Sequence, residues 1–409
     1  MEITRRSFLT RTSAVTWGMG LPVVFQRAAS AAPKSDRPGG DQTVLVVVQL
    51  SGGNDGLNTV IPYRDPAYRQ ARPKLRQDAA KVKTINADLA LHPAMQGFAD
   101  LLEKSRLAIV QGVGYPNPNR SHFSSMDIWH KATRSTSQRY GWLGRTLPRL
   151  GNGSAAMYIG EGESPLALFG TTGYAPSLTS LADYQMKIGG GRDSEAKRRL
   201  ITDFAAGKPS HDSRILNLVR ETARATYASS EQLRKVARSY KTPVAYPSTG
   251  LAARLRLVAQ LIDAGVPERI YYTALGGFDT HAAQSGTHSN LLKELSDAVA
   301  AFQKDITHHG HHKRVLVMTF SEFGRRVREN GSGGTDHGTA SQMFLIGEKV
   351  RSGLIGKHPR MTDLDQGDLK FHTDFRSVYA TILKQWLKID PLPILGKPYP
   401  QLKLVRHVG

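Results

Sequence analysis

The chain of 409 residues carries 55 lysines and arginines against 34 acidic residues, with 14 histidines and no cysteine. With 40% apolar residues it can bury a large core, which excludes a disordered protein, and its length suits one large α/β domain with insertions or two to three smaller domains. The lack of cysteine excludes disulfides, iron–sulfur clusters, cysteine nucleophiles and thiolate metal sites. Any metal must therefore be held by histidine nitrogen and oxygen ligands.

The N-terminal segment has the features of an export signal. A twin-arginine motif, TRRSFL at 4–9, precedes a mildly apolar run over 14–25 and small residues at 29–31. Their order predicts a twin-arginine signal peptide over 1–31, a flexible leader over 32–42 and a periplasmic or secreted protein. A basic N-terminal arm is the alternative. The apolar run contains two glycines and a proline and is too short for a stable membrane span, so we expect no span after cleavage.

The excess of basic residues indicates which kinds of partner the protein can bind. Cleavage after Ala31 would leave 51 basic and 33 acidic residues, a net charge of +18. This charge favours an anionic small-molecule or polymer substrate, although it also serves solubility. The sequence shows no helix-turn-helix, ribonucleoprotein motif or long basic block, so we expect no nucleic acid partner. The twin-arginine export machinery is the other expected partner.

Strands and helices alternate along the mature chain. Apolar runs predict strands over 43–50, 107–110, 269–275, 315–320 and 342–346, and amphipathic patterns predict helices over 94–104, 121–132, 251–264, 289–306 and 374–387. This alternation predicts a mostly parallel α/β sheet in a single domain over 43–409. An insertion or cap is expected at about 135–250, with strand-like pieces at 156–159 and 166–169 and helical stretches at 194–204 and 212–240.

Metal-type ligands follow three of the predicted strands. In open α/β sheets, ligands bind beyond the carboxyl ends of strands. A single aspartate there can equally cap a helix or make a turn, but aspartate–histidine pairs in glycine-rich loops favour a site for one or two divalent ions such as Zn, Mn, Ca or Mg. The candidate metal ligands are Asp55 after the first strand, Asp279 and His281 after the third, and Glu322, Asp336 and His337 after the fourth.

Ser121 lies beyond the second strand and opens the helix predicted over 121–132. A serine at a helix N-terminus beside a metal is a candidate nucleophile, because the ion and the helix dipole stabilise its alkoxide; an ordinary N-cap is the alternative. Its neighbours Arg120, as an anion clamp, and His122, as a ligand or base, complete the predicted catalytic group. Asn54 and Arg325 are predicted to contact the substrate, although Arg325 can also pair with nearby glutamates.

Other histidines are weaker candidates. The tract His308–His312 precedes a strand, at the far end from the predicted site, which is more typical of a solvated helix end than of catalysis. His358 precedes a proline and His372 begins the last predicted helix. Either can complete a metal shell, but capping and surface roles are more common for such residues.

Six motifs in fixed order resemble a known family. Behind a twin-arginine signal come QLSGGNDG at 49–56, NRSHF at 119–123, GGFDTH at 276–281, FSEFGR at 320–325, GTDHG at 334–338 and TDFRSVY at 373–379. Over about 43–390 the chain resembles a bacterial domain-of-unknown-function family placed in the alkaline phosphatase/sulfatase superfamily. The resemblance implies an alkaline-phosphatase-like three-layer α/β/α sandwich with the inserted middle region.

The resemblance also implies roles for the site residues. Asp55, Asp336 and His337 would hold one metal, Asp279 and His281 would hold the other, and Ser121 would match the nucleophile position. The pattern departs from alkaline phosphatases because one residue, not three, separates the Asp and His of the third loop. Glu322 stands where an Asp-His pair is expected, and the sulfatase motif C/S-x-P-x-R is absent, which argues against standard sulfatase chemistry.

These observations together predict an exported, metal-dependent hydrolase of phosphate or related esters, with a serine nucleophile next to a one- or two-metal site. The altered ligand spacing supports a second hypothesis, a non-catalytic periplasmic binding or assembly protein that retains the superfamily fold. A binder of envelope polymers through its basic surface is the third.

Overall fold

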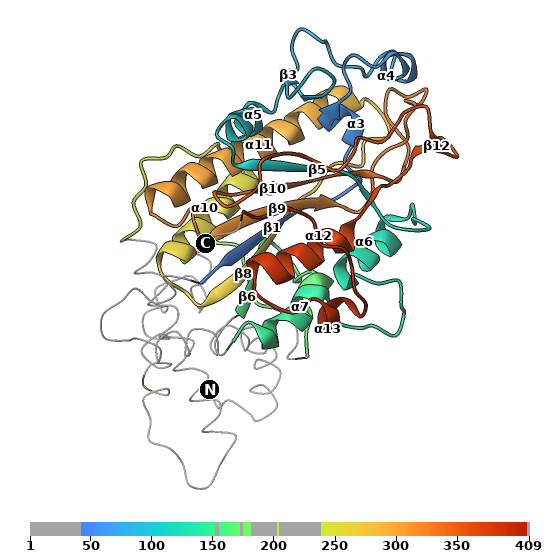
Figure 1. The fold of residues 1–409 in the computed structure, drawn as a ribbon. Helices are drawn as coiled ribbons and strands as arrows, with labels where there is room; N and C mark the ends of the chain where they lie inside the picture. Colours follow the sequence, from blue (N-terminus) through green and yellow to red (C-terminus); the bar gives the residue numbers. More distant parts are fainter. Residues whose placement is uncertain (1–41, 152–154, 172–174, 181–202, 204–238, 407–409) are drawn as a thin grey trace, which may run out of the picture.

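The computed structural model describes residues 42–151, 155–171, 175–180, 203 and 239–406 (Figure 1). The predicted signal peptide over 1–31 lies outside the described residues, as does all of the predicted leader except its last residue. Most of the helical stretches predicted over 194–204 and 212–240 also lie outside them.

A nine-stranded sheet forms the centre of the described chain, in the order β11-β5-β10-β9-β1-β8-β6-β7, with β14 paired to β5. β1 (Val44–Leu50) is parallel to both of its neighbours, β8 (Glu268–Leu275) and β9 (Val315–Ser321). β10 (Ser341–Ile346) is antiparallel to β9 and to β5 (Leu107–Gly114), and the other pairings in this sheet are parallel. The predicted mostly parallel α/β sheet is confirmed.

The sheet extends beyond the predicted strands at both edges. The piece predicted at 156–159 is confirmed as β6 (Ala155–Ile159), and the added strands are β7 (Ser177–Leu178), β11 (Gly353–Ile355) and β14 (Thr373–Asp374). Because β6 and β7 come from the region 135–250, this part of that region completes the central sheet. The strand predicted over 166–169 is wrong. It is the 3-10 turn η3 (Leu166–Leu168), closed by a hydrogen bond of 2.9 Å from the Leu168 N–H to the Pro165 carbonyl.

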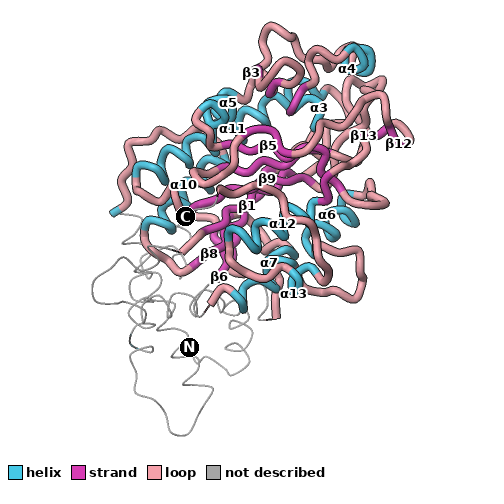
Figure 2. Tube along the Cα trace, viewed as in Figure 1, coloured by secondary structure: helices cyan, strands magenta, loops and turns pink. Residues whose placement is uncertain are grey.

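Helices cover both faces of the sheet (Figures 1 and 2). One face carries α5 (Gln96–Glu103), α10 (Gly250–Asp263) and α11 (Gln284–His308). The other carries α6 (His122–Lys131), α7 (Trp142–Thr146), α12 (Phe375–Thr381) and α13 (Leu392–Leu395). Along β1, Val44, Val46 and Val48 enter the first core, and Leu45 and Val47 enter the second. A strand buried on both faces thus gives the three-layer α/β/α arrangement.

The predicted helices are confirmed with small shifts at their ends. α11 begins five residues earlier than predicted, and the last predicted helix continues past α12 as a π-helical turn over Ile382–Trp386. The elements that the sequence pattern did not indicate are short. Besides the added strands, α7 and α13, they include α3 (Gly56–Thr59), β2 (Val60–Ile61), α4 (Pro66–Ala71), β3 (Lys83–Thr84), β4 (Ala90–Leu91), η2 (Leu147–Arg149), β12 (Leu364–Asp365) and β13 (Asp368–Leu369).

The sheet topology brings the motif loops to one edge. β1, β5, β8 and β9 run in the same direction, so the loops that follow them lie at the same carboxyl edge. Because β10 is antiparallel to β9, the segment 322–340 both leaves and rejoins the sheet at this edge. The edge therefore collects the residues that the sequence marks as ligands.

Candidate metal centre

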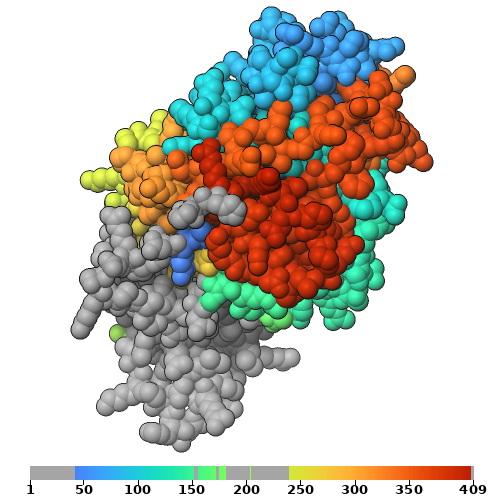
Figure 3. Space-filling model, in the orientation of Figure 1, coloured from blue at the N-terminus to red at the C-terminus, as the bar shows by residue number. Residues whose placement is uncertain are grey.

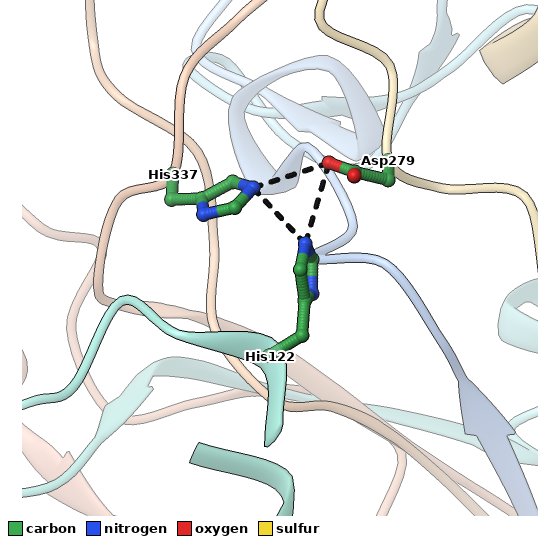
Figure 4. A group of neighbouring side chains, drawn as sticks. All are labelled: His122, Asp279 and His337. Atoms are coloured by element: carbon green, nitrogen blue, oxygen red, sulfur yellow. Dashed lines mark hydrogen bonds and ion pairs between the residues drawn. The ribbon is translucent and has the colours of Figure 1, made fainter. Parts of the chain in front are cut away.

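Two histidines and an aspartate from three separate segments converge at the carboxyl edge (Figure 4). Ligand atoms of His122, Asp279 and His337 all lie within 4.8 Å of one another. His281 adds a fourth ligand atom, since its Nε2 lies 2.9 Å from His337 Nε2 and 3.0 Å from Asp279 Oδ1. Two imidazoles and one carboxylate thus converge, and the third imidazole adjoins two of these three ligands. Such a donor set is typical of zinc and related divalent metals.

Two of these histidines, His122 and His337, have a close oxygen acceptor at their other ring nitrogen. Nδ1 of His122 lies 2.8 Å from Glu322 Oε1, and Nδ1 of His337 lies 2.8 Å from the Arg120 carbonyl oxygen. Both oxygens only accept hydrogen bonds, so each Nδ1 carries the proton and donates it. In the neutral imidazole, Nε2 then presents its lone pair to the cluster, the arrangement that metal-ligating histidines usually show.

The same pattern makes the cluster unfavourable without a cation. Nε2 of His122 and Nε2 of His337 are only 3.0 Å apart, and His337 Nε2 is 3.1 Å from the Asp279 carboxylate. Lone pairs and a negative charge facing one another repel unless a proton or a metal ion lies between them. The geometry of the cluster therefore fits a bound divalent cation better than a set of neutral side chains.

Asp279 is held as a carboxylate. Burial alone would raise its pKa, but the hydrogen bond and the positive charge of Arg325 outweigh that effect and lower the pKa to about 2. The side chain is nevertheless 48% exposed, and that of His281 is 46% exposed. A solvent-borne ligand can therefore reach the cluster from this side.

Asp336 stands behind His281 and does not join the convergent atoms. Its Oδ1 lies 3.4 Å from His281 Nδ1 and accepts a hydrogen bond of 3.2 Å from the Asn330 amide. The Asn330 hydrogen bond is the main cause that lowers the pKa of Asp336. Glu322 likewise lies behind His122, since both of its oxygens are buried and bonded. Both acids were predicted as metal ligands, but in the structure each contacts the Nδ1 atom of a histidine instead of joining the convergent atoms.

Arg325 connects the loops and does not face solvent. Its side chain is fully buried and donates to Asp279 Oδ1 at 2.7 Å, to the Thr335 carbonyl at 2.8 Å and to the carbonyls of Gly53, Phe278 and Gly52. All three strand-end loops are thus tied to one guanidinium. The predicted contact of Arg325 with substrate is corrected, because the donors that such a contact needs are already used.

Asp55 is paired with Arg72 and is not among the convergent ligand atoms. Arg72 forms a bidentate ion pair with it, at 2.6 Å and 3.1 Å, and Gln284 donates to the same carboxylate at 2.5 Å. Burial would raise the pKa of Asp55, but the charge and hydrogen bonds of Arg72 outweigh it and lower the pKa. Asp55, which was predicted as a metal ligand, therefore belongs to a buried ion pair in this structure. Arg72 was not predicted, because no sequence motif marks it.

Asn54 is also buried, at 1% exposure. Its side-chain oxygen lies 2.9 Å from His288 Nε2 and accepts from the Thr59 hydroxyl at 3.2 Å. Burial lowers the pKa of His288 to about 4, so this histidine is neutral and donates its Nε2 proton to Asn54. The predicted contact of Asn54 with substrate is corrected, because the side chain stabilises the loop from inside.

Ser121 is exposed at the N-cap position of α6, next to the cluster residue His122. Its side chain makes no capping hydrogen bond, and its N–H donates to Asn119 Oδ1 at 2.8 Å. The side chain of Arg120 is 36% exposed and forms an ion pair with buried Asp368, in which Nε donates at 2.9 Å. The role of Ser121 as a nucleophile stays a prediction, and the Arg120 guanidinium is paired with Asp368.

The histidine tract lies apart from the metal centre. His309 stacks on the Tyr240 ring with centroids 4.8 Å apart, and His311 Nε2 lies 3.0 Å from Asp263 Oδ1. Within the described residues, the tract contributes to no group of three or more metal ligands. The helices of the described part also include none that is long and apolar enough to cross a membrane.

Comparison with solved structures finds distant likenesses to hydrolases and related enzymes. A sulfatase from Pseudoalteromonas sp., PsFucS1, is 13% identical, with 90% of this chain and 71% of the sulfatase covered and a TM-score of 0.38. The C-terminal periplasmic domain of EcEptC from Escherichia coli, in complex with Zn, is 8% identical over 76% and 75% of the two chains, with a TM-score of 0.35. Alkaline phosphatase from the Antarctic bacterium TAB5 is 9% identical over 75% and 92%, with a TM-score of 0.31. At TM-scores of this size, these likenesses do not identify an activity.

No curated protein matches the chain. A protein-family model described as "Protein of unknown function (DUF1501)" matches residues 42–394, which include the whole metal cluster and both layers of helices. Since this match spans most of the sequence, the chain belongs to the DUF1501 family.

Proposed function

We propose that the protein is an exported, metal-dependent hydrolase of phosphate or related esters. The observation that carries this proposal is the convergence of the His122 and His337 imidazole nitrogens with the Asp279 carboxylate, with His281 adjoining them. The Nδ1 atoms of His122 and His337 contact oxygen acceptors. A divalent metal held there would polarise the ester and stabilise the charge that develops on its oxygens. The residues that would hold it are His122, Asp279, His281 and His337.

Ser121 is the nucleophile in this proposal. It is exposed, it follows Arg120, and it stands at the N-terminus of α6, where the first backbone N–H groups and the helix dipole favour negative charge. Its hydroxyl oxygen would attack the phosphorus or sulfur atom, and the alcohol of the ester would leave. Water would then hydrolyse the ester formed on Ser121 and restore the hydroxyl.

The second candidate function is binding without turnover. It is favoured by the Asp55–Arg72 ion pair, which leaves one group of convergent ligand atoms in the described part of the chain. A protein with one metal and no activated nucleophile would bind an anionic group without cleaving it. Hydrolysis requires the Ser121 hydroxyl as a nucleophile, whereas binding without turnover does not.

The test starts from protein exported and matured in its own cell, with metal analysis and a panel of phosphate monoesters, phosphate diesters and sulfate esters. We expect about one equivalent of metal, lost together with turnover in His337→Ala. Ser121→Ala should keep the metal but lose turnover by about a thousandfold or more. His311→Ala, a histidine outside the cluster, is the matched control and should change neither. Full metal occupancy without turnover of any ester would favour the binding protein.

Export is the remaining part of the proposal and rests on residues 1–31. Replacing the motif arginines by lysine (R5K with R6K) keeps the charge but removes the guanidinium pair that defines the signal. We expect the precursor to accumulate in the cytoplasm, as followed by fractionation, whereas K34R outside the motif should be exported normally. Normal export of the double lysine variant would refute the twin-arginine route.

A further inference from the structure

A groove in the segment that follows β1 is lined by two arginines without an acidic partner. The groove has a volume of about 430 Å³, and its lining consists of Tyr63, Tyr68, Arg69, Arg76, Gln77, Asp78 and Ala79. It shares no residue with the metal cluster. We propose that this groove binds a phosphate or sulfate ester group carried on an organic backbone, as an anion site separate from the metal centre.

The local charge is strongly basic. Residues 62–83 contain seven lysines and arginines but only two acidic residues, Asp65 and Asp78. Both carboxylates have other partners. Asp65 caps α4 by accepting from the Ala67 N–H at 2.8 Å, whereas Asp78 accepts from the Ala80 N–H at 3.0 Å and lies 3.7 Å from Lys81. Neither acid forms an ion pair with the groove arginines.

The neighbouring arginines differ from the two in the groove. Arg72 is buried against Asp55, and Arg64 lies over the Tyr63 ring, 5.4 Å from its centroid. Arg69 and Arg76 are exposed, and no hydrogen bond or ion pair links either guanidinium to another described residue. Each guanidinium has five N–H donors in a fork that matches the oxygens of phosphate or sulfate. The groove thus presents two unpaired guanidiniums against one carboxylate, that of Asp78, which accepts from the Ala80 N–H and lies near Lys81. The excess positive charge favours an anion.

The walls of the groove are held firmly in place. The buried Tyr68 hydroxyl donates to Asn58 Oδ1 at 2.8 Å and accepts from the Gln77 N–H at 3.0 Å. Glu329, in the segment 322–340, accepts from the backbone N–H groups of Lys74 and Leu75. The segment after β1 and the segment 322–340 therefore lie side by side, shown in blue and orange in Figure 3. A preformed groove loses less conformational freedom on binding.

The size of the groove favours an ester over a free ion. Its volume falls in the range of pockets that hold small organic molecules and exceeds what one tetrahedral anion fills. A sugar or glycerol unit that carries the phosphate or sulfate would occupy the remaining space. Binding there does not require the metal centre, so the site does not depend on the proposed hydrolysis.

The experiment measures binding to the mature protein in the presence of a chelator, by calorimetry at several salt concentrations. The probes are a glycerol-phosphate oligomer, a sulfated tetrasaccharide, uncharged maltotetraose and poly-glutamate. The test variant is Arg69→Gln with Arg76→Gln, and the matched control is Arg64→Gln with Lys83→Gln, which removes the same charge from the same segment. The phosphate and sulfate probes distinguish the two sources of the anion.

We expect at least one of the two ester probes to bind the wild type, and the test variant to bind it at least about tenfold more weakly. The slope of log K against log salt should become shallower by about one to two, since two ionic contacts are lost. The control should stay within about twofold of the wild type. An equal loss in the control, equal binding of poly-glutamate or of maltotetraose, or loss of binding in the chelator would overturn the proposal. None of these outcomes depends on whether the metal centre hydrolyses esters.

Discussion

Replacing Glu322 by glutamine tests whether this buried acid orients a metal ligand. Glu322 is 2% exposed, and its Oε1 accepts from the Gly52 N–H and from His122 Nδ1, both at 2.8 Å. Glutamine keeps the size of the side chain and one acceptor oxygen but removes the negative charge. His122 would then be less firmly held in the tautomer that directs its Nε2 at the cluster, and its nitrogen would become a weaker ligand.

The expected magnitude follows from the contacts. Loss of an orienting carboxylate typically lowers metal affinity by about 10- to 100-fold, which is about 1.4–2.7 kcal/mol. The His122–Glu322 contact is short and its acceptor is buried, so the hydrogen bond is charge-assisted and poorly screened. We therefore expect the Glu322→Gln variant to fall in the upper half of that range.

The assay is competition for zinc against a chromophoric chelator at pH 7, with circular dichroism to confirm folding. Asp263→Asn is the matched control, because it also removes a carboxylate from a histidine, His311, at 3.0 Å but away from the cluster. The control should bind zinc as the wild type does. Folded Glu322→Gln with affinity within about threefold of the wild type would refute the orienting role, as would an equal loss in the control.

Three further predictions concern stability, each measured by urea unfolding. Arg325→Met should lower the free energy of unfolding by about 3–5 kcal/mol, because it leaves a carboxylate and several buried carbonyls without their donor. A loss below about 1 kcal/mol would contradict the conclusion that Arg325 holds the loops together. Burial raises the pKa of Glu268 from 4.5 to about 7, so the folded state binds the proton more tightly and the free energy of unfolding should fall as pH rises from about 4.5 to 7. Glu268→Gln should remove about 3 kcal/mol of that fall, whereas an unchanged pH profile would contradict the burial argument. Gly53→Ala should lower the free energy of unfolding by more than about 1 kcal/mol, because Gly53 has a φ of +72° and an added Cβ would lie 2.4 Å from Phe323. The control Gly331→Ala places its Cβ within 4 Å of no atom and should be nearly neutral.

The sheet was predictable because its signal is local. A continuous apolar run such as Val44–Leu50 indicates a strand buried on both faces, wherever the rest of the chain goes. The rule that ligands lie beyond strand ends then placed Asp279, His281 and His337 at one edge, and the structure brings these three together with His122. Short elements such as η3 were not predictable, because four apolar residues fit a strand or a turn equally well.

The sequence did not predict which carboxylates face the cluster and which contact an arginine or a histidine instead. Whether a carboxylate faces a metal or an arginine depends on which cation the fold brings closest, and that partner is distant in sequence or unmarked by a motif. Arg72 comes from a segment with no helical or strand periodicity, yet it occupies both oxygens of Asp55. Glu322 follows its strand directly but is covered by the Gly52 backbone, so it reaches His122 instead of the cluster.

Charge balance at this edge favours one divalent ion over two. Four carboxylates lie in or behind the cluster and its adjoining loop, those of Asp55, Asp279, Glu322 and Asp336, against the two buried guanidiniums of Arg72 and Arg325. With neutral imidazoles the sum is −2, which a single divalent ion neutralises. A second divalent ion would leave a surplus of +2 at a partly buried edge and would have to displace Arg72 from Asp55 to gain an oxygen ligand. Removing that guanidinium would break a buried ion pair, a change that typically costs several kcal/mol. A metal content close to one per chain is therefore the stoichiometry that the electrostatics of this edge supports.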